Sequence, residues 1–244
     1  MRLDWVDDDN DGVGRMLRDV CTLRRVPWHE VRNWERPVVR RFDGRLSLDR
    51  TLNAKARGEI RRRQRRLEER LGAEVEIRDR SDSSAVDEFL QLEVSGWKGR
   101  GGTAYANRPE AELWFREMCK EFESRGKLHF ISLESGGRSL EMQCFLREGT
   151  TAFSLRVGHD AELDRFGPGV PVHAAAVEFF EGTDVELIDS RADSGNEYWS
   201  RIYPDRRRMV DLIIAPGNIV DRTAVRLLPV LAFGRTTLAR SKTV

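Results

Sequence analysis

The stretch Arg165–Ser190, RFGPGVPVHAAAVEFFEGTDVELIDS, carries the pattern that decides the fold of this chain. It reads as a glycine-containing loop, a helix of about three turns that ends at Gly182, and a strand over Val185–Ile188. Proline lacks an amide hydrogen, so Pro168 or Pro171 fits only near the start of the helix. The loop therefore opens the helix.

The start of this helix predicts an anion-binding site. Its first-turn amides have no intrahelical acceptor and lie at the positive end of the helix dipole, which suits a phosphate or pyrophosphate. Gly167 and Gly169 would let the main chain approach such an anion closely. An ordinary turn before a helix has the same pattern, so both interpretations stay open. The apolar residues of the helix predict one face packed on a sheet: Val172, Ala176, Val177 and Phe180.

Composition narrows the class of protein. The chain has 244 residues and is 39% hydrophobic, enough for one full domain and a partial one. Its 42 Lys and Arg nearly balance 41 Asp and Glu, so no global basic field predicts nucleic-acid binding. The three cysteines lack metal-ligand spacing, which favours reduced thiols and no metal. No apolar run approaches the roughly 20 residues of a membrane span, so we expect a cytoplasmic protein without a membrane partner.

The first 45 residues predict a partial β-α-β unit. A strand is expected at Leu3–Val6, a helix at Gly14–Val26 and a second strand at Val38–Phe42. The apolar residues on one face of the helix are Met16, Leu17, Val20 and Leu23. Because so small a unit cannot close a core, it must pack on the rest of the chain or on a partner.

A charged helix is expected at Asn53–Leu71. Between Arg57 and Arg70 it carries seven arginines and three glutamates, beside a thin apolar seam. The arginines that could grip the phosphates of a nucleotide or an RNA are Arg61, Arg62, Arg63, Arg65 and Arg66. A solvated face with i, i+4 charge pairs is the alternative interpretation.

The remaining elements predict a mixed, mostly antiparallel sheet with helices on both faces, an α/β (α+β) fold. The segment Ser95–Ala104, SGWKGRGGTA, is rich in glycine and is expected to lack regular structure. The other expected elements are strands at Ala73–Ile77, Leu128–Leu133, Leu140–Leu146, Thr151–Val157 and Met209–Ile214, and helices at 82–94, Pro109–Ser124 and Asn196–Tyr203.

This element order, with an anion loop before its third helix, resembles the GNAT superfamily of N-acetyltransferases. Three segments closely resemble its cellulose-biosynthesis-type branch: SGWKGRGGTA (95–104), RFGPGV (165–170) and IDSRADSGNEYWSRIYPDRRRMVDLIIA (188–215). That branch is similar in turn to the Fem-type aminoacyltransferases, which stack two such folds. The resemblance implies a remnant of a first copy over 1–45, a complete transferase fold over 46–216 and a tail over 217–244.

The resemblance implies an N-acyltransferase that moves an acyl group, typically acetyl, from a CoA thioester to an amine. The donor, acyl-CoA, is expected at Arg165, Gly167, Gly169 and Val170, and no metal is implied. Many members of the superfamily have a tyrosine acid in a pattern like N-x-x-A-x-x-x-Y. Asn196, Trp199 and Tyr203 keep that spacing, with Trp in place of Ala. Tyr203 is therefore the predicted acid, with Tyr198 as its competitor.

Candidates for taking the proton of the amine are Asp189, at the end of its strand, and Glu93, beside the glycine-rich segment. Over the acceptor side, Trp97 is expected to stack on the substrate, while Lys98 and Arg100 meet an anionic group. Asn196 is placed among the substrate contacts. A lid that serves only the fold is the alternative for this segment.

Two other functions stay open. One is amide formation with an aminoacyl-tRNA, which the arginine-rich helix favours and the near-zero net charge disfavours. The other is an inactive module for binding or assembly. The expected partner is a small-molecule amine, or tRNA for the second hypothesis, and a homodimer is compatible with the sequence.

Overall fold

A computed structural model of the chain describes residues 1–9, 12–50, 52–82, 84–166, 170–217 and 220–228. The chain forms two compact units. One comprises Met1–Arg36 and the residues from Arg206 onward, and the other is Pro37–Asp205. The division predicted from sequence, at 45/46 and 216/217, stays a prediction. Among the described residues, no helix is both long enough and apolar enough to cross a membrane.

The larger unit is built on a mixed sheet with the strand order β2-β7-β6-β5-β4-β3. Its strands are β2 (Trp28–Arg40, with the residues from Pro37 in this unit), β3 (Glu76–Asp79), β4 (Leu128–Ser135), β5 (Arg138–Glu148), β6 (Thr151–His159) and β7 (Leu187–Asp189). All neighbours are antiparallel except β6 and β7. The long connection from β6 to β7 allows these two strands to run parallel. In contrast, β4 and β5 are joined by a tight turn in which Gly136 and Gly137 both have a positive φ.

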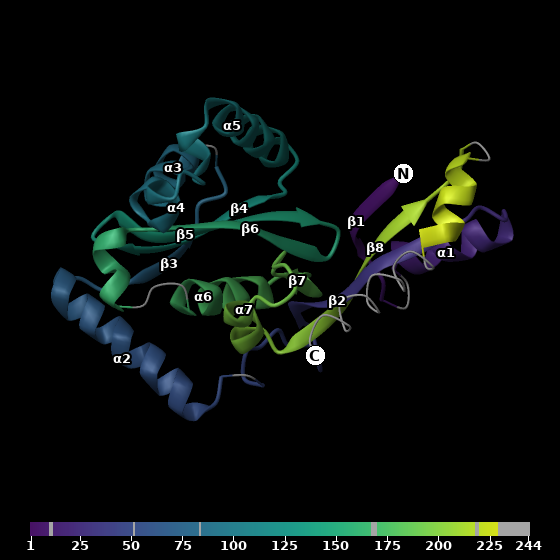
Figure 1. Ribbon diagram of the computed structural model, residues 1–244. Helices are drawn as coiled ribbons and strands as arrows, with labels where there is room; N and C mark the ends of the chain where they lie inside the picture. The colour runs from purple at the N-terminus through teal and green to yellow at the C-terminus, as the bar shows by residue number, and fades with distance from the viewer. Residues whose placement is uncertain (10–11, 51, 83, 167–169, 218–219, 229–244) are drawn as a thin grey trace, which may run out of the picture. The chain divides into compact units, whose positions relative to one another are not determined.

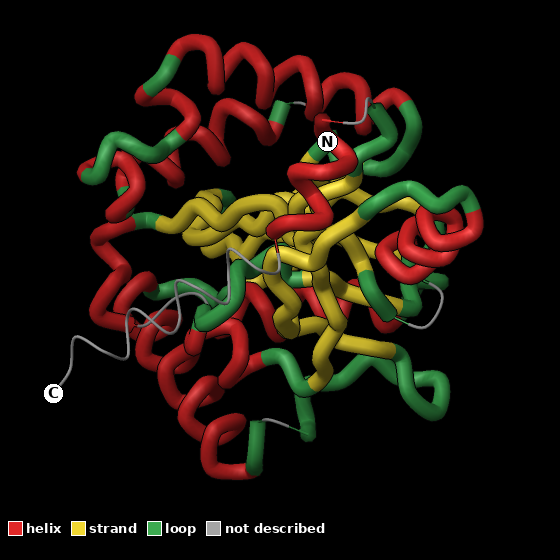
Figure 2. The backbone as a smooth tube through the Cα atoms, turned by 45° about the vertical axis from the view of Figure 1, so that its right-hand side comes forward, coloured by secondary structure: helices red, strands yellow, loops and turns green. Residues whose placement is uncertain are grey.

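Helices cover both faces of this sheet (Figures 1 and 2). Helices α3 (Ala85–Ser95) and α5 (Pro109–Ser124) bury Phe89 and Phe115 against β4 and β5. On the other face, α6 (Val170–Glu181) packs the apolar side predicted from its sequence. Helix α2 (Ala54–Leu71) lies beyond it. The sequence therefore predicted the fold class correctly, because the helical and strand periodicities are strong in this unit.

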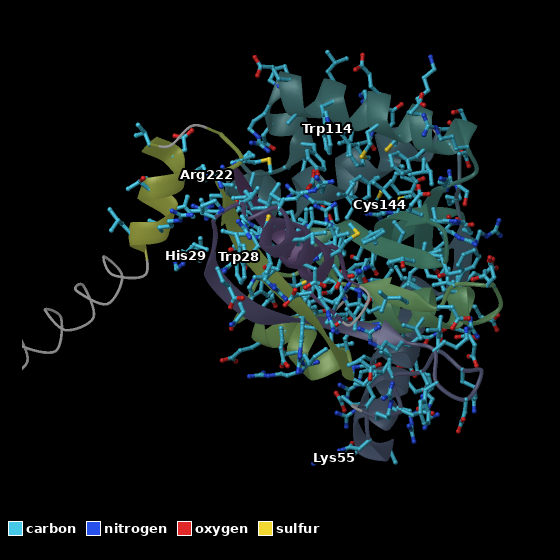
Figure 3. The ribbon with its side chains drawn as sticks, turned by 90° about the vertical axis from the view of Figure 1, so that its right-hand side faces the viewer. Trp28, His29, Lys55, Trp114, Cys144 and Arg222 are labelled. Carbon is cyan, nitrogen blue, oxygen red and sulfur yellow. The ribbon has the colours of Figure 1, made fainter. Side chains whose placement is uncertain are left out.

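The cysteines of the described residues are free, as the sequence predicted, and the structure shows that they are buried. Cys144 of β5 lies in the interior, while Trp114 lies on the outer side of α5 (Figure 3). Burial raises the pKa of the Cys144 thiol well above its usual value. This thiol is therefore a core group.

Several predicted elements have different bounds in the structure. The segment 95–104 is not wholly irregular, because Trp97–Arg100 form one helical turn, α4. The strand expected at Val185–Ile188 is Leu187–Asp189, and that expected at Ala73–Ile77 is Glu76–Asp79. The helix expected at Asn196–Tyr203 is α7 (Glu197–Ile202). Short 3-10 helices occupy Tyr105–Asn107 and Ala161–Phe166.

The smaller unit has the strand order β1-β8-β2, from β1 (Arg2–Asp7), β8 (Asp205–Ile214) and the first part of β2. The prediction for β2 was wrong in length, since the strand begins at Trp28 and not at Val38. Helix α1 (Val13–Leu23) and a helix at 220–228 complete the unit. Leu17 of α1 packs on β8, but Met16, Val20 and Leu23 are exposed.

Gly14 explains that rotation of α1. A Cβ at Gly14 would lie 2.8 Å from Val210 Cγ1, so the glycine lets the helix meet β8 on this side. Of the predicted apolar stripe, Leu17 alone packs on the unit's own sheet, whereas Met16, Val20 and Leu23 are exposed.

Candidate functional site

The site of interest lies where β6 and β7 separate. Their parallel pairing ends at Phe153 and Asp189, and β6 continues to His159. Cys144 of β5 pairs with Arg156 and Phe145 pairs with Ser154, which leaves Leu155 as a bulge. A bulge bends its strand and redirects side chains. As a result, Ser154 contacts groups on the α6 face, and Arg156 contacts groups on the α3 face.

On the α6 face, Gln143 links two polar side chains in a buried network. Its amide nitrogen donates to Ser154 Oγ at 2.8 Å. His173, on the first turn of α6, donates from Nδ1 to Gln143 Oε1 at 2.8 Å. Burial lowers the pKa of His173 to about 3, so the ring is neutral and Nδ1 carries the proton. All three residues are at most 3% exposed, so this is a buried hydrogen-bond network between α6 and the sheet, and it holds its side chains in fixed positions.

Tyr203 packs beside this network, with its ring near those of His173 and Trp199. It follows α7 directly as the C-cap residue and is fully buried. Its ring lies edge-on to Trp199, with centroids 4.9 Å apart, and Trp199 lies 4.2 Å from the ring of His173. Burial raises the pKa of Tyr203, and the charges of Tyr198 and Asp189 raise it further, so the hydroxyl stays protonated.

Asp189, at the end of β7, lies near enough to Tyr203 for its charge to raise the pKa of that hydroxyl. It is fully buried, and its Oδ1 accepts from the Arg191 amide at 2.7 Å. Arg191 has a positive φ of 53°, so the Asp189 side chain holds a tight turn after the strand. The structure thus brings together two residues that the sequence predicts for catalysis, Asp189 and Tyr203.

Glu93 lies on the opposite face, in an ion pair. Its Oε1 accepts from Arg156 Nε at 2.5 Å, and its Oε2 accepts from the Tyr105 amide at 2.7 Å. The guanidinium of Arg156 also bonds the Thr103 carbonyl and lies over the Tyr105 ring. Glu93 is 1% exposed. These contacts tie the 95–104 segment to α3 and β6.

Gly158 of β6 allows α3 to pack close to this strand. A Cβ on it would lie 2.9 Å from the Glu93 amide nitrogen and 3.1 Å from the Phe89 carbonyl. Any larger residue would therefore push α3 away from β6.

The 95–104 segment lies along the part of β6 that extends beyond its pairing with β7. Lys98 donates from Nζ to the Val157 carbonyl of β6. Trp97 is 60% exposed, and Arg100 is exposed with a weak bond to the Ser95 carbonyl. Asn196 lies elsewhere, as the N-cap of α7, with its Oδ1 accepting from the Trp199 amide at 3.3 Å. The predicted acceptor contacts are therefore not gathered at one point.

Lys98 carries a testable electrostatic signature. Burial lowers its pKa to about 8, and the nearby charge of Arg156 lowers it in the same direction. We expect one of the five lysine resonances of the 15N-labelled or reductively 13C-methylated protein to titrate with a midpoint near 8. This resonance should be missing from the Lys98→Arg variant. A wild-type spectrum in which no lysine titrates below pH 9.5 would show that Lys98 is solvated.

The predicted donor residues lie only in part within the described residues. Gly167 and Gly169 lie outside them, and of Arg165 and Val170 the main chain alone is described. Helix α6 begins at Val170, with Pro171 as its second residue, which confirms the predicted start. Among the residues that the structure describes, no three His, Cys, Asp or Glu side chains group to hold a metal ion.

Sequence reasoning missed Gln143, His173 and the buried Glu141. The signal was present in Leu140–Leu146, LEMQCFL, where Glu141 and Gln143 alternate with apolar residues along the predicted strand. Polar side chains on a covered face predict a buried network. His173 gave no such signal, because its partner lies 30 residues away.

The chain matches the family described as the acetyltransferase (GNAT) domain over residues 54–199. A comparison with proteins of curated function finds no match. Among solved structures, the C-terminal domain of a lysylphosphatidylglycerol synthetase candidate from Agrobacterium fabrum is similar at 12% identity and a TM-score of 0.55. The match covers 93% of this chain and 70% of that one.

Two further structures have the same fold. A conserved protein of unknown function from Bacteroides thetaiotaomicron is 16% identical with a TM-score of 0.52, over 81% of this chain and 66% of that one. L-PGS from Bacillus licheniformis is 12% identical with a TM-score of 0.50, over 93% and 72%. The chain thus spans about two thirds of the length of the structures it resembles.

Proposed function

This chain belongs to the acetyltransferase (GNAT) domain family, and from that membership we propose that it transfers an acyl group from a CoA thioester to an amine. The observation that carries the proposal is the separation of β6 from β7 beside the start of α6. Diverging strands leave main-chain groups free to bind an extended ligand, and the helix start suits its diphosphate. Within the superfamily, the three motifs favour the cellulose-biosynthesis-type branch.

In the proposed reaction, the amine nitrogen attacks the thioester carbonyl carbon, and the carbon–sulfur bond breaks. Tyr203 donates its proton to the leaving thiolate, and its hydroxyl is protonated over the working pH range. Asp189, beside Tyr203, accepts the proton of the amine directly or through water. Glu93 is the second candidate for that step. Its ion pair with Arg156 favours a structural role.

The donor diphosphate is proposed to lie at the start of α6, against the main chain of 165–170. The acceptor is proposed to approach along 95–104, where the exposed Trp97 offers a stacking surface and Arg100 offers a charge. Asn196 is retained as a substrate contact at the start of α7.

A second candidate function is amide formation with an aminoacyl-tRNA. It is supported by α2, on which Arg61, Arg62, Arg63, Arg65 and Arg66 are all exposed. Glu59 pairs with Arg62 and Arg63, so part of that charge is neutralised within the helix. The two solved structures with synthetase names share the fold, and at 12% identity they support no more than that.

Calorimetry with acetyl-CoA, CoA and aminoacyl-tRNA separates the two functions. We expect acetyl-CoA to bind both the wild type and a variant with Arg62, Arg65 and Arg66 changed to alanine, with affinities within about twofold. A transferase that uses tRNA would instead lose more than tenfold in tRNA affinity, because three phosphate contacts are removed.

The matched control changes Arg15, Arg24 and Arg226, exposed arginines of the other unit, to alanine. It removes the same charge without touching α2. Binding of tRNA but not of CoA would overturn the main proposal, and binding of neither would favour an inactive module.

A further inference from the structure

The register of β6 decides which way its main-chain groups point. The Asp160 amide donates to the Leu140 carbonyl of β5 at 2.9 Å, so these residues occupy a hydrogen-bonded position of the ladder. Such positions alternate with non-hydrogen-bonded ones, which Val157 and His159 therefore occupy. Their amides and carbonyls point away from β5, toward the side on which β7 ends at Asp189. We call this side of residues 154–159 the open edge of β6.

Two side chains of the 95–104 segment bind carbonyls of the open edge. Lys98 donates from Nζ to the Val157 carbonyl, and the Ser95 hydroxyl donates to the His159 carbonyl at 2.8 Å. Both acceptors are the outward groups that the register predicts. The ε-amine of Lys98 therefore lies against the open edge, and the proposed reaction gives it no role.

The turn that carries Lys98 is held in place by its main chain. The Thr103 amide donates to the Lys98 carbonyl at 2.8 Å. A Cβ at Gly99 would lie 1.8 Å from the Val94 carbonyl oxygen, so only glycine fits there. The backbone of Lys98 is therefore fixed relative to β6, and a positioned amine of this kind reacts without a large loss of entropy.

The surroundings of Lys98 favour its neutral form. Burial is the main cause that lowers its pKa to about 8, and the Arg156 guanidinium of β6 acts in the same direction. The carboxylates of Glu93 on α3 and Glu141 on β5 act against it, and Glu93 is itself paired with Arg156. Within the described residues, Lys98 donates to a carbonyl and to no carboxylate. The neutral amine, which is the nucleophilic form, is therefore well populated near pH 8.

We propose that Lys98 is itself an acyl acceptor, and that the chain acylates this side chain from its own bound acyl-CoA. Nζ attacks the thioester carbonyl carbon, the carbon–sulfur bond breaks, and an amide forms on Nζ. The proton that the nitrogen loses goes to the thiolate, which leaves as CoA. The inference rests on the proposed function, because the donor is proposed to lie where β6 and β7 separate. The product amide is uncharged, so acylation also removes the cost of a half-buried charge.

Mass spectrometry of the full-length protein after incubation with acetyl-CoA tests this step. We expect one acetyl group per chain, located on Lys98 after digestion. At pH 8 the neutral fraction of Lys98 exceeds that of a solvated lysine by about 100-fold. Lys98 should therefore react at least tenfold faster than Lys55 and Lys120, which are exposed. Acetylation that follows exposure, with Lys98 last, would overturn the proposal.

The kinetics distinguish a reaction in the site from one in solution. The rate at Lys98 should saturate with acetyl-CoA, fall when CoA is added as a competitor, and be independent of protein concentration. It should rise with pH and level off above a midpoint near 8, because the amine reacts only when it is unprotonated. A rate that increases linearly with acetyl-CoA and continues to rise up to about pH 10 is that of a solvated lysine and contradicts the proposal.

Two variants locate the acceptor. Lys98→Arg removes the amine and keeps a cation that can bind the Val157 carbonyl, and it should acquire no fast acetyl group. Lys120→Arg, on the exposed side of α5, is the matched control and should be acetylated at the wild-type rate. Circular dichroism and thermal unfolding confirm that both fold. Fast acetylation of the Lys98→Arg variant would place the acceptor elsewhere.

Calorimetry with acetyl-CoA and CoA release with added amines test the proposed function separately. If acetyl-CoA binds and amines are acylated while Lys98 is unmodified, the inference fails alone. If acetyl-CoA does not bind, S-acetyl-N-acetylcysteamine, a thioester without the diphosphate, tests the amine directly. Selective acetylation of Lys98 by this compound would keep Lys98 as the reactive amine and leave only the proposed donor wrong. Equal acetylation of Lys98, Lys55 and Lys120 would overturn both.

Discussion

Replacing Glu93 by alanine is expected to lower the free energy of unfolding by about 3 to 5 kcal/mol. The side chain is buried and accepts from both the Arg156 guanidinium and the Tyr105 amide. Its removal leaves Arg156 without its buried counter-ion and the amide without its acceptor. Urea denaturation followed by tryptophan fluorescence measures the loss. Glu117→Ala, on the exposed side of α5, is the control and should change stability by less than about 0.5 kcal/mol.

A double variant distinguishes the ion pair from simple loss of packing. Glu93→Ala combined with Arg156→Met should be more stable than Glu93→Ala alone, because the unpaired charge is gone. If Glu93→Ala unfolds at the wild-type urea concentration but loses turnover, Glu93 is a proton acceptor and not a structural residue.

The Tyr203→Phe variant is expected to reduce kcat for CoA release by about 100-fold, the contribution of a positioned general acid. The phenyl ring keeps the packing against Trp199 and His173, so only the proton donor is lost. CoA release from acetyl-CoA is followed with a thiol reagent in the presence of a series of amines. KM for acetyl-CoA should change little, since the hydroxyl acts after donor binding.

Tyr198→Phe is the matched control, because Tyr198 is the other tyrosine of the same cluster. Its expected loss is less than tenfold. The reverse ranking of the two variants would give the acid role to Tyr198. Full activity of both variants would remove tyrosine from the mechanism and leave water as the proton source.

The sequence predicted the elements best where local chemistry decides them. The glycine pair Gly136-Gly137 and the proline early in α6 indicate a turn and a helix start in the sequence alone. The structure confirms both, with a positive φ at Gly137 and a helix that begins at Val170. The first part of β2 was not predicted, because its local sequence lacks the pattern of a strand. Trp28–Arg36 is charged, and its side chains find partners such as Asp211 and Trp34 only in the folded unit, so apolar alternation is absent.

The candidate site shows the same limit. Glu93, Asp189 and Tyr203 could be singled out as residue types at suggestive positions, but their partners could not. Glu93 and Arg156 are 63 residues apart, and Gln143 and His173 are 30 apart. Such pairs are set by strand register and by the bulge at Leu155, which shifts the register of β6 by one residue.

By itself, then, the sequence determined the order of helices and strands, the class of the sheet and the membership of the family. These depend on periodicity, on turn residues and on contiguous motifs, all of which are local along the chain. Only the tertiary structure decided which buried polar groups pair, which face of α1 meets β8, and that Lys98 lies against the open edge of β6. These depend on how closely distant segments approach, and packing of the whole unit sets that distance.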